Sequence, residues 1–192
     1  MDNLQQERMD LPPHTIAEVI VTAEKIDERV NQLVNEMQGH CRTDNLVMIG
    51  ILRGSFMFVA DLVRALYAHD IHPRIDFMTL ESYGTGTQSS GNVVIRKDIT
   101  VDVSGADVVL IDDILDSGRT LAFAQRLLTS KGAKSVKSCV LLDKPETRIA
   151  QFAADFVGFS IEDSFVVGYG LDYNSYYREL PYIARIGFPE EV

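Results

Sequence analysis

The chain has 192 residues, of which 46% are hydrophobic, so it is long and apolar enough to form one domain with a substantial core, and disorder is not expected. Its formal net charge of −10 disfavours a nucleic-acid partner, whose backbone is also anionic, but leaves open a local site for a small phosphate. Cys41 and Cys139 lie far apart without a Cys-x-x-Cys spacing, and neither a secretory signal nor an apolar run of roughly 20 residues is visible, which favours a cytoplasmic protein with no membrane partner.

The N-terminal part begins with an arm. Residues 1–14, with Pro12 and Pro13 near their end, predict a flexible segment, and residues 15–192 are expected to form a single domain. A β-prone run at residues 16–21 comes first. Thr22 is then a candidate cap for a helix that reaches about residue 40, because apolar side chains recur there at helical spacing.

From residue 46 onward, strand and helix signals alternate. The expected strands cover residues 46–52, 74–80, 93–99, 107–111, 136–142 and 152–157, and the expected helices cover residues 56–68 and 120–131. Ser55 is a candidate cap for the first of these helices. A segment rich in glycine, serine and threonine at residues 82–92 predicts a flexible loop, and residues 165–169 and 182–186 predict a small final element. This order indicates an α/β fold with a mostly parallel sheet, which binds ligands beyond the carboxyl ends of its strands.

The segment VVLIDDILDSGRT, residues 108–120, is the most informative motif. A buried strand is followed by Asp112 and Asp113, and then by a turn of small residues that begins at Asp116 and leads into a helix. Backbone N–H groups and the hydroxyls of Ser117 and Thr120 can point at one centre there, with the helix dipole behind them. We expect this turn to hold a phosphate monoester. It is not a Walker loop, because the GxxxxGK[ST] spacing is absent.

The acidic pair beside this turn predicts a second function. Neighbouring carboxylates repel each other, so a cation or a diol is their natural ligand. Mg²⁺ prefers one or two carboxylates with phosphate oxygens and water, and ribose hydroxyls can donate to the same oxygens. A surface turn with solvated acids is the alternative, but the combination of acidic pair, small-residue turn and helix start favours a site for a 5-phosphorylated ribose and its metal.

These motifs resemble a known family. Apolar residues, an acidic pair, two further apolar residues and Asp-Ser/Thr-Gly-x-Thr are similar to the phosphoribosyl pyrophosphate motif of type I phosphoribosyltransferases. The order of the motifs over residues 16–186 resembles bacterial hypoxanthine-guanine phosphoribosyltransferases. The further matching motifs are Leu52-Arg53-Gly54, Ser82-Tyr83-Gly84, Leu141-Leu142-Asp143-Lys144-Pro145 and Phe165-Val166-Val167-Gly168-Tyr169-Gly170-Leu171-Asp172-Tyr173.

The resemblance implies a fold, a reaction and partners. The fold is that of a type I phosphoribosyltransferase, with a mostly parallel central sheet flanked by helices and a small hood subdomain from the chain ends. The reaction is a purine-salvage transfer, dependent on Mg²⁺, of 5-phosphoribosyl from phosphoribosyl pyrophosphate to hypoxanthine and guanine. Its products are IMP or GMP and pyrophosphate. The family also implies a homodimer or homotetramer. The preference for xanthine stays open.

The resemblance also assigns roles to residues. Asp116 matches the general base that handles the proton of the purine ring, Ser82-Tyr83 match a mobile lid, and Lys144 matches the residue that reads the 6-oxo group. The positions matched to phosphoribosyl pyrophosphate are Leu52, Arg53, Gly54, Ser82, Tyr83, Asp112, Asp113, Asp116, Ser117, Gly118, Arg119, Thr120 and Arg178. The positions matched to the purine are Lys144, Phe165, Val166 and Asp172, and the metal positions are Asp112, Asp113 and Asp172. Many relatives have Glu-Asp at the acidic pair, so the first carboxylate here is one methylene shorter.

Two other functions compete with this interpretation. A regulator with the same fold would sense phosphoribosyl pyrophosphate, but the acidic charge and the lack of an added helix-turn-helix disfavour it, and a purine-recognition set of Lys144, Phe165 and Asp172 is present. A phosphoacceptor receiver domain also gathers acids at strand ends. It is rejected, because the acidic pair and Asp116 share one turn here instead of lying far apart in the chain.

Overall fold

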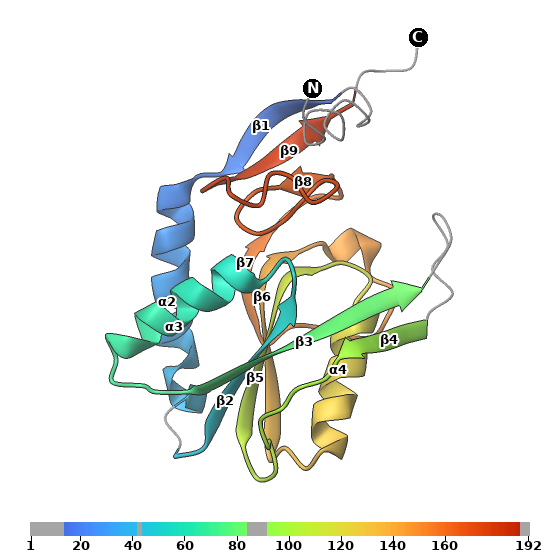
Figure 1. The fold of residues 1–192 in the computed structure, drawn as a ribbon. Helices are drawn as coiled ribbons and strands as arrows, with labels where there is room; N and C mark the ends of the chain where they lie inside the picture. The colour runs from blue at the N-terminus through green and yellow to red at the C-terminus, as the bar shows by residue number, and fades with distance from the viewer. Residues whose placement is uncertain (1–13, 42–43, 84–91, 189–192) are drawn as a thin grey trace, which may run out of the picture.

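The structure is a computed structural model that describes residues 14–41, 44–83 and 92–188. Its centre is a six-stranded sheet in the order β4-β3-β2-β5-β6-β7, in which all neighbouring strands are parallel except β3 and β4 (Figure 1). The expected α/β fold with a mostly parallel sheet is therefore confirmed. Its strands are β2 (Leu46–Leu52), β3 (Arg74–Tyr83), β4 (Asn92–Lys97), β5 (Asp107–Leu115), β6 (Ser135–Asp143) and β7 (Phe156–Ser160).

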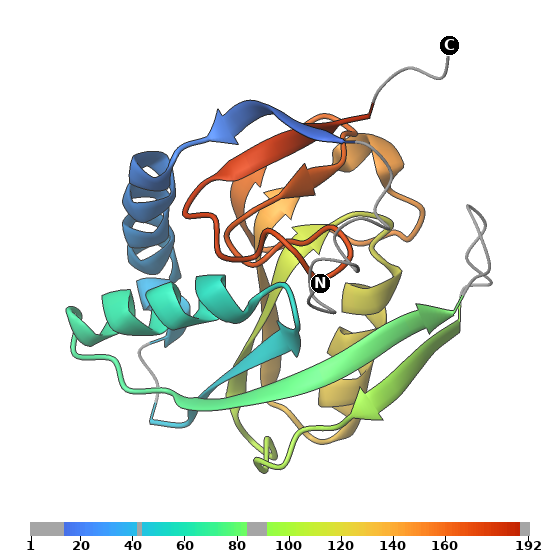
Figure 2. The same cartoon turned by 45° about the horizontal axis from the view of Figure 1, so that its top comes forward.

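Helices cover both faces of this sheet. α2 (Ala23–Cys41) and α3 (Phe56–Tyr67) lie on one face, and α4 (Arg119–Ser130) lies on the other (Figure 2). Side chains of β5 alternate between the two faces of the sheet. Val109 and Ile111 join the core under α2 and α3, whereas Val108 and Leu110 join the core under α4. A strand buried on both faces needs such a continuous apolar run. Within the described ranges, no helix has the combined length and apolar character that a membrane crossing requires.

A second, three-stranded antiparallel sheet is built from segments near the two ends of the described chain. Its order is β1-β9-β8, from β1 (Thr15–Val21), β9 (Ile183–Gly187) and β8 (Val166–Val167). We call these strands, with the connection between β8 and β9, the hood. Figure 1 shows the hood beyond one end of the large sheet. It covers the carboxyl end of β2, because Gly170 of the hood packs against the carbonyl of Gly54, which follows that strand.

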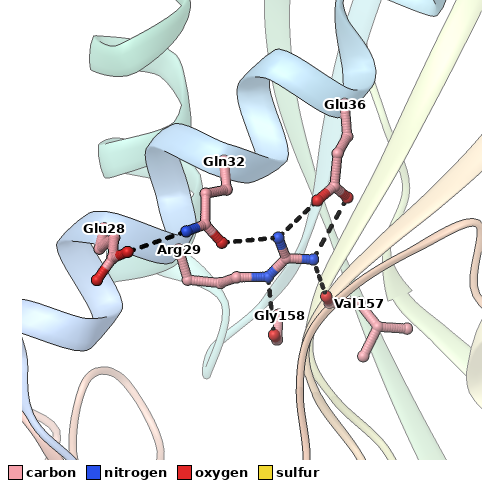
Figure 3. A network of polar contacts seen from close by, with 6 residues as sticks. All are labelled: Glu28, Arg29, Gln32, Glu36, Val157 and Gly158. Atoms are coloured by element: carbon pink, nitrogen blue, oxygen red, sulfur yellow. Dashed lines mark hydrogen bonds and ion pairs between the residues drawn. The ribbon is translucent and has the colours of Figure 1, made fainter.

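The edge strand β7 is tied to helix α2 by a polar network (Figure 3). The Arg29 guanidinium donates to the backbone carbonyls of Gly158 at 3.0 Å and Val157 at 2.8 Å. It also donates to Glu36 at 2.6 Å and to Gln32 at 3.2 Å on its own helix. One side chain thus satisfies two carbonyls of the outermost strand and holds the helix against them.

One expected strand was misplaced. We predicted residues 152–157, but the strand is β7, which begins at Phe156. The Asp155 carboxylate accepts the N–H of Ser138 at 2.8 Å, and the N–H of Asp155 donates to the Ser138 hydroxyl at 3.1 Å. Residues before Phe156 are therefore held to β6 by side-chain bonds, and the regular backbone ladder starts only after them.

Several element boundaries also differ from the predictions. Ser55 does not cap α3, because its buried hydroxyl donates to the carbonyl of Ile51 at 2.6 Å instead. β4 ends at residue 97 and not 99, and there the Asp98 carboxylate accepts the N–H of Ile99. β5 continues to residue 115, so the acidic pair lies within the strand. The predicted loop at residues 82–92 is shorter at both ends, since residues 82, 83 and 92 belong to strands.

Other sequence predictions agree with the structure or fall outside its described part. The Thr22 hydroxyl accepts the N–H of Lys25 at 3.4 Å, as expected for the cap of α2. The helix expected at residues 120–131 is α4, and Gly132 follows its C-terminal end with a left-handed φ of +90°. Residues 84–91 of the predicted loop, and residues 1–13 of the predicted arm, lie outside the described residues.

Candidate active site

A cavity of about 330 Å³ lies at the carboxyl ends of β2 and β5, between these strands and the hood. It brings together residues from motifs that are far apart in the sequence. The predicted site residues on its wall are Leu52, Arg53, Gly54, Asp112, Asp113, Asp116, Ser117, Gly118, Thr120, Asp172 and Arg178. The carboxyl edge of a parallel sheet is where an α/β fold gathers side chains from successive loops.

The phosphate turn joins β5 to α4. Gly118 precedes the helix with a left-handed φ of +80°, and a Cβ there would lie 3.1 Å from Cδ of Arg148. The carbonyl of Ser117 accepts the N–H groups of Ile149 at 3.1 Å and Ala150 at 2.9 Å. The turn is therefore fixed from behind, while the N-terminal end of α4 opens toward the cavity with the positive end of its dipole.

The acidic pair forms the floor of the cavity beside this turn. Asp112 is 6% exposed, and one of its oxygens accepts the backbone N–H of Asp113 at 3.0 Å. Burial, together with the charge of Asp113, raises the pKa of the Asp112 carboxyl well above its usual value. Burial also raises the pKa of Asp113, against the opposing effect of the Arg178 guanidinium. Two adjacent carboxylates held this way are costly to ionise alone, and a cation or hydroxyl donors would stabilise their charged form.

The loop after β2 packs tightly between the acidic pair and the hood. The peptide bond between Leu52 and Arg53 is cis. A Cβ on Gly54 would lie 1.6 Å from Oδ2 of Asp113, and a Cβ on Gly170 would lie 2.1 Å from the carbonyl oxygen of Gly54. Only glycine fits at both positions, so the backbone of this loop can approach the acidic pair closely.

On the hood side of the cavity, two predicted residues form an ion pair. Nη2 of Arg178 lies 2.7 Å from Oδ1 of Asp172, and the Ser175 N–H donates to Oδ2 of Asp172 at 2.7 Å. Nη1 of Arg178 donates to the carbonyl of Gly170 at 2.5 Å. The pair places a cation and a carboxylate opposite Asp112 and Asp113. Among the described residues, no three histidine, cysteine or acidic side chains converge on one point as a protein-only metal cage would.

Of the four predicted purine residues, Asp172 lines this cavity, whereas Lys144, Phe165 and Val166 do not. Lys144 is 8% exposed, and its ammonium donates to Asp163 at 3.2 Å. Its backbone N–H donates to the carbonyl of Leu115, so it lies next to the phosphate turn. Phe165 is 47% exposed and stands edge-on to Tyr173, with ring centres 5.5 Å apart.

Among the described side chains, Val166 and Arg119 are also outside the cavity wall. Val166 is buried in β8 and pairs with Arg185 of β9. Arg119 is the first residue of α4. Ser82 and Tyr83 end β3, where their backbone pairs with β4.

Sequence reasoning missed the partners that hold some of these residues. Asp163, which binds Lys144, lies 19 residues away in the chain. Tyr169, which binds Asp61 of α3, lies 108 residues away. Tyr169 belongs to a matched motif, but no pattern in the sequence links it to a particular carboxylate.

Comparisons with known proteins show the family to which the chain belongs. The profile of the phosphoribosyl transferase domain matches residues 18–174. The chain is 45% identical over 170 residues to the hypoxanthine-guanine phosphoribosyltransferase of Bacillus subtilis. The aligned region covers 88% of this chain and 93% of that protein. The chain is 42% identical over 175 residues to the hypoxanthine phosphoribosyltransferase of Escherichia coli, with 90% and 96% covered.

A solved structure gives the same result. The fold matches a crystal structure of a hypoxanthine phosphoribosyltransferase from Staphylococcus aureus with a TM-score of 0.85 and 42% identity, covering 90% of this chain and 92% of that one. The domain profile, the curated relatives and the fold thus point to one group of enzymes. The chain belongs to the phosphoribosyltransferase family, and within it to the hypoxanthine-guanine phosphoribosyltransferases.

Proposed function

We propose that the chain transfers the 5-phosphoribosyl group of phosphoribosyl pyrophosphate to hypoxanthine, and to guanine, and releases IMP or GMP with pyrophosphate. The observation that supports this most is the single cavity that holds an acidic pair, a phosphate turn and the loop after β2. The names of the relatives from Bacillus subtilis and Escherichia coli give the bases. Such a reaction serves purine salvage.

The two ends of phosphoribosyl pyrophosphate would bind at opposite sides of the cavity. The 5-phosphate fits the turn of Ser117 to Thr120, where hydroxyls, backbone N–H groups and the dipole of α4 are available. The pyrophosphate fits between the loop of Arg53 and Gly54 and the Arg178 guanidinium. The ribose between them would donate its hydroxyls to the acidic pair. When the sugar loses pyrophosphate, these carboxylates would stabilise the positive charge on the ring.

The base would enter from the side of β6 and β8. Phe165 presents an exposed ring for stacking, and Lys144 is a donor only, so it favours an oxo group over the amino group of adenine. The backbone carbonyl of Val166 would contact the edge of the base. Asp116 is exposed at the cavity, and we assign it as the general base that removes the proton from the purine ring. Ser82 and Tyr83 would belong to a lid that excludes water.

The donor set on the cavity wall fits Mg²⁺. Asp112, Asp113 and Asp172 supply carboxylate oxygens, and the ion needs only one or two of these besides ligand oxygens and water. When bound, Mg²⁺ would neutralise charge on the pyrophosphate leaving group. We further propose that residues 15–192 act as a single domain after a flexible arm, and that the enzyme is a cytoplasmic homodimer or homotetramer.

A binding experiment tests the site. IMP and phosphoribosyl pyrophosphate share a 5-phosphate, so calorimetry should show that they compete for one site. Thr120→Ala should weaken both by about tenfold, because both lose the same hydroxyl donor. A single-turnover mixture with hypoxanthine should then yield IMP. Independent binding of the two ligands, or a Thr120→Ala effect on only one of them, would contradict the placement of the phosphate.

The regulator remains as an outcome of the same experiment. It would bind phosphoribosyl pyrophosphate at the turn and form no IMP from hypoxanthine. If IMP forms as fast as the complex with phosphoribosyl pyrophosphate disappears, the chain is not such a regulator.

A further inference from the structure

Tyr169 has an unusual backbone conformation for a bulky residue. Its φ is +50°, between Gly168 at +99° and Gly170 at +101°. A large side chain in the left-handed region costs conformational energy, so contacts around it must hold it there. The residue is only 6% exposed. Glycine adopts such angles freely, whereas tyrosine does not. The side-chain contacts of Tyr169 therefore hold it in this conformation.

The side chain of Tyr169 joins the hood to the core. Its hydroxyl donates to Oδ2 of Asp61 on α3 at 2.6 Å, and its backbone N–H donates to the carbonyl of Leu180 at 2.8 Å. Asp61 in turn accepts from Nη1 of Arg64 at 2.7 Å. A short hydrogen bond to a carboxylate is one of the stronger polar contacts in proteins. It therefore fixes this point of the hood relative to α3.

The next residue, Gly170, connects Tyr169 to the wall of the cavity. The N–H of Gly170 donates to the carbonyl of Arg178 at 3.0 Å, and its own carbonyl accepts Nη1 of Arg178 at 2.5 Å. Its backbone lies against the carbonyl of Gly54, because an added Cβ would lie 2.1 Å from that oxygen. Gly170 thus contacts the two groups, Arg178 and the Gly54 loop, to which we assign the pyrophosphate. The phosphate turn is held by other contacts, in which the carbonyl of Ser117 accepts the N–H groups of Ile149 and Ala150.

We propose that the Tyr169–Asp61 hydrogen bond is a positioning device for the pyrophosphate end of the site, and this inference rests on the proposed function. Tyr169 touches no substrate in this account. It acts through Gly170 on the Arg178 guanidinium and on the backbone of Gly54. The 5-phosphate end is held by separate elements, β5 and α4. Loss of the hydrogen bond should therefore weaken ligands that contain pyrophosphate and spare those that lack it.

Matched variants separate this role from a general loss of stability. Tyr169→Phe removes only the hydroxyl, and Asp61→Ala removes its acceptor, whereas Asp61→Asn keeps an oxygen that can accept. Tyr67→Phe is the control. It also removes a tyrosine hydroxyl, but from a 74% exposed side chain on α3, the helix that carries Asp61. The measurements are KM for phosphoribosyl pyrophosphate and the Kd values of pyrophosphate and IMP, with thermal melting as a check on folding.

We expect Tyr169→Phe and Asp61→Ala to raise KM for phosphoribosyl pyrophosphate and Kd for pyrophosphate by about fivefold. The Kd of IMP should stay within about twofold of the wild-type value. The Kd of pyrophosphate for the double variant should be no higher than that for either single variant. Asp61→Asn and Tyr67→Phe should resemble the wild type. An unchanged Kd for pyrophosphate in folded Tyr169→Phe, or an equal loss of IMP binding, would overturn the inference. Failure of the wild type to form IMP would refute the proposed function separately, because pyrophosphate binding is measured without turnover.

Discussion

Asp116 shows how one residue's position can assign its chemistry. It follows the last residue of β5 and begins the phosphate turn, so it stands between the acidic pair and the residues that we propose hold the 5-phosphate. Its side chain is exposed at the cavity, unlike that of Asp112. A carboxylate in this place can accept a proton from a base that approaches the sugar, whereas the buried pair is better suited to charge stabilisation.

Replacement of this residue tests the assignment. Asp116→Asn should lower kcat by about 10²-fold or more, because the amide cannot accept the purine proton. The Kd for phosphoribosyl pyrophosphate should change little, since the donors of the turn are untouched. Steady-state kinetics and calorimetry measure the two quantities. A folded variant that no longer binds phosphoribosyl pyrophosphate would show that Asp116 holds the substrate and is not the base.

The acidic pair should affect stability and binding in opposite directions. Burial and the neighbouring charge raise the pKa of Asp112, so its ionised form destabilises the ligand-free fold. Asp112→Asn removes that charge and keeps an oxygen for the N–H of Asp113. We expect a higher Tm for the ligand-free variant at pH 8 and weaker binding of phosphoribosyl pyrophosphate with Mg²⁺. A lower Tm with unchanged binding would place Asp112 outside the site and make it a structural group.

At the scale of elements, single carboxylates and guanidinium groups join strands to the segments beside them. Asp76 of β3 accepts the N–H groups of Thr100 at 2.6 Å and Val101 at 2.9 Å, and also the Thr100 hydroxyl. It thereby fixes the connection that leads from β4 to β5. Arg29 does the same between α2 and β7. These contacts keep β5, which carries the acidic pair, and its neighbours in a defined arrangement.

The Asp76 contact predicts a pH dependence of stability. Burial alone would raise the pKa of this carboxyl, but the hydrogen bonds from Val101, Thr100 and Phe77 lower it from 3.8 to about 2. Because the folded pKa is depressed, the stabilisation is present above about pH 4 and is lost as the pH falls toward 2. Urea unfolding should show that Asp76→Asn is less stable than the wild type at pH 7, with a difference that shrinks over this range. Asp70→Asn, at a side chain that is 98% exposed, is the control. A difference independent of pH would contradict the account.

The Arg29 network makes a second prediction at this scale. Arg29→Met keeps the aliphatic stem but leaves the carbonyls of Val157 and Gly158 without their donor, so the free energy of unfolding should fall by about 1–3 kcal/mol. Lys134→Met removes a 68% exposed cation and should cost less than about 1 kcal/mol. Denaturant unfolding of the two variants decides the matter. Equal effects would mean that the network adds nothing beyond a surface ion pair.

At the scale of the whole molecule, the sequence predicted what depends on local patterns. The alternation of strands and helices indicated the parallel sheet, and the small residues after β5 indicated the phosphate turn. It could not place the start of β7, because side chains of Ser138 and Asp155 decide where pairing begins. It could not link Tyr169 to Asp61 or Lys144 to Asp163, because these contacts join distant segments through the fold. The family resemblance pointed to residues many of which line one cavity, whereas the contacts that hold these residues became visible only in three dimensions.

The enzyme transfers a phosphoribosyl group to 6-oxopurines. The most direct test of this activity is a spectrophotometric assay with phosphoribosyl pyrophosphate in which hypoxanthine, guanine, xanthine and adenine are offered separately, with and without Mg²⁺. We predict turnover of hypoxanthine and guanine that requires Mg²⁺, and no turnover of adenine, because Lys144 can only donate to the base. The turnover of xanthine, compared with that of hypoxanthine and guanine, shows whether xanthine is also a substrate. Turnover of adenine, or of no base while phosphoribosyl pyrophosphate still binds, would contradict the claim.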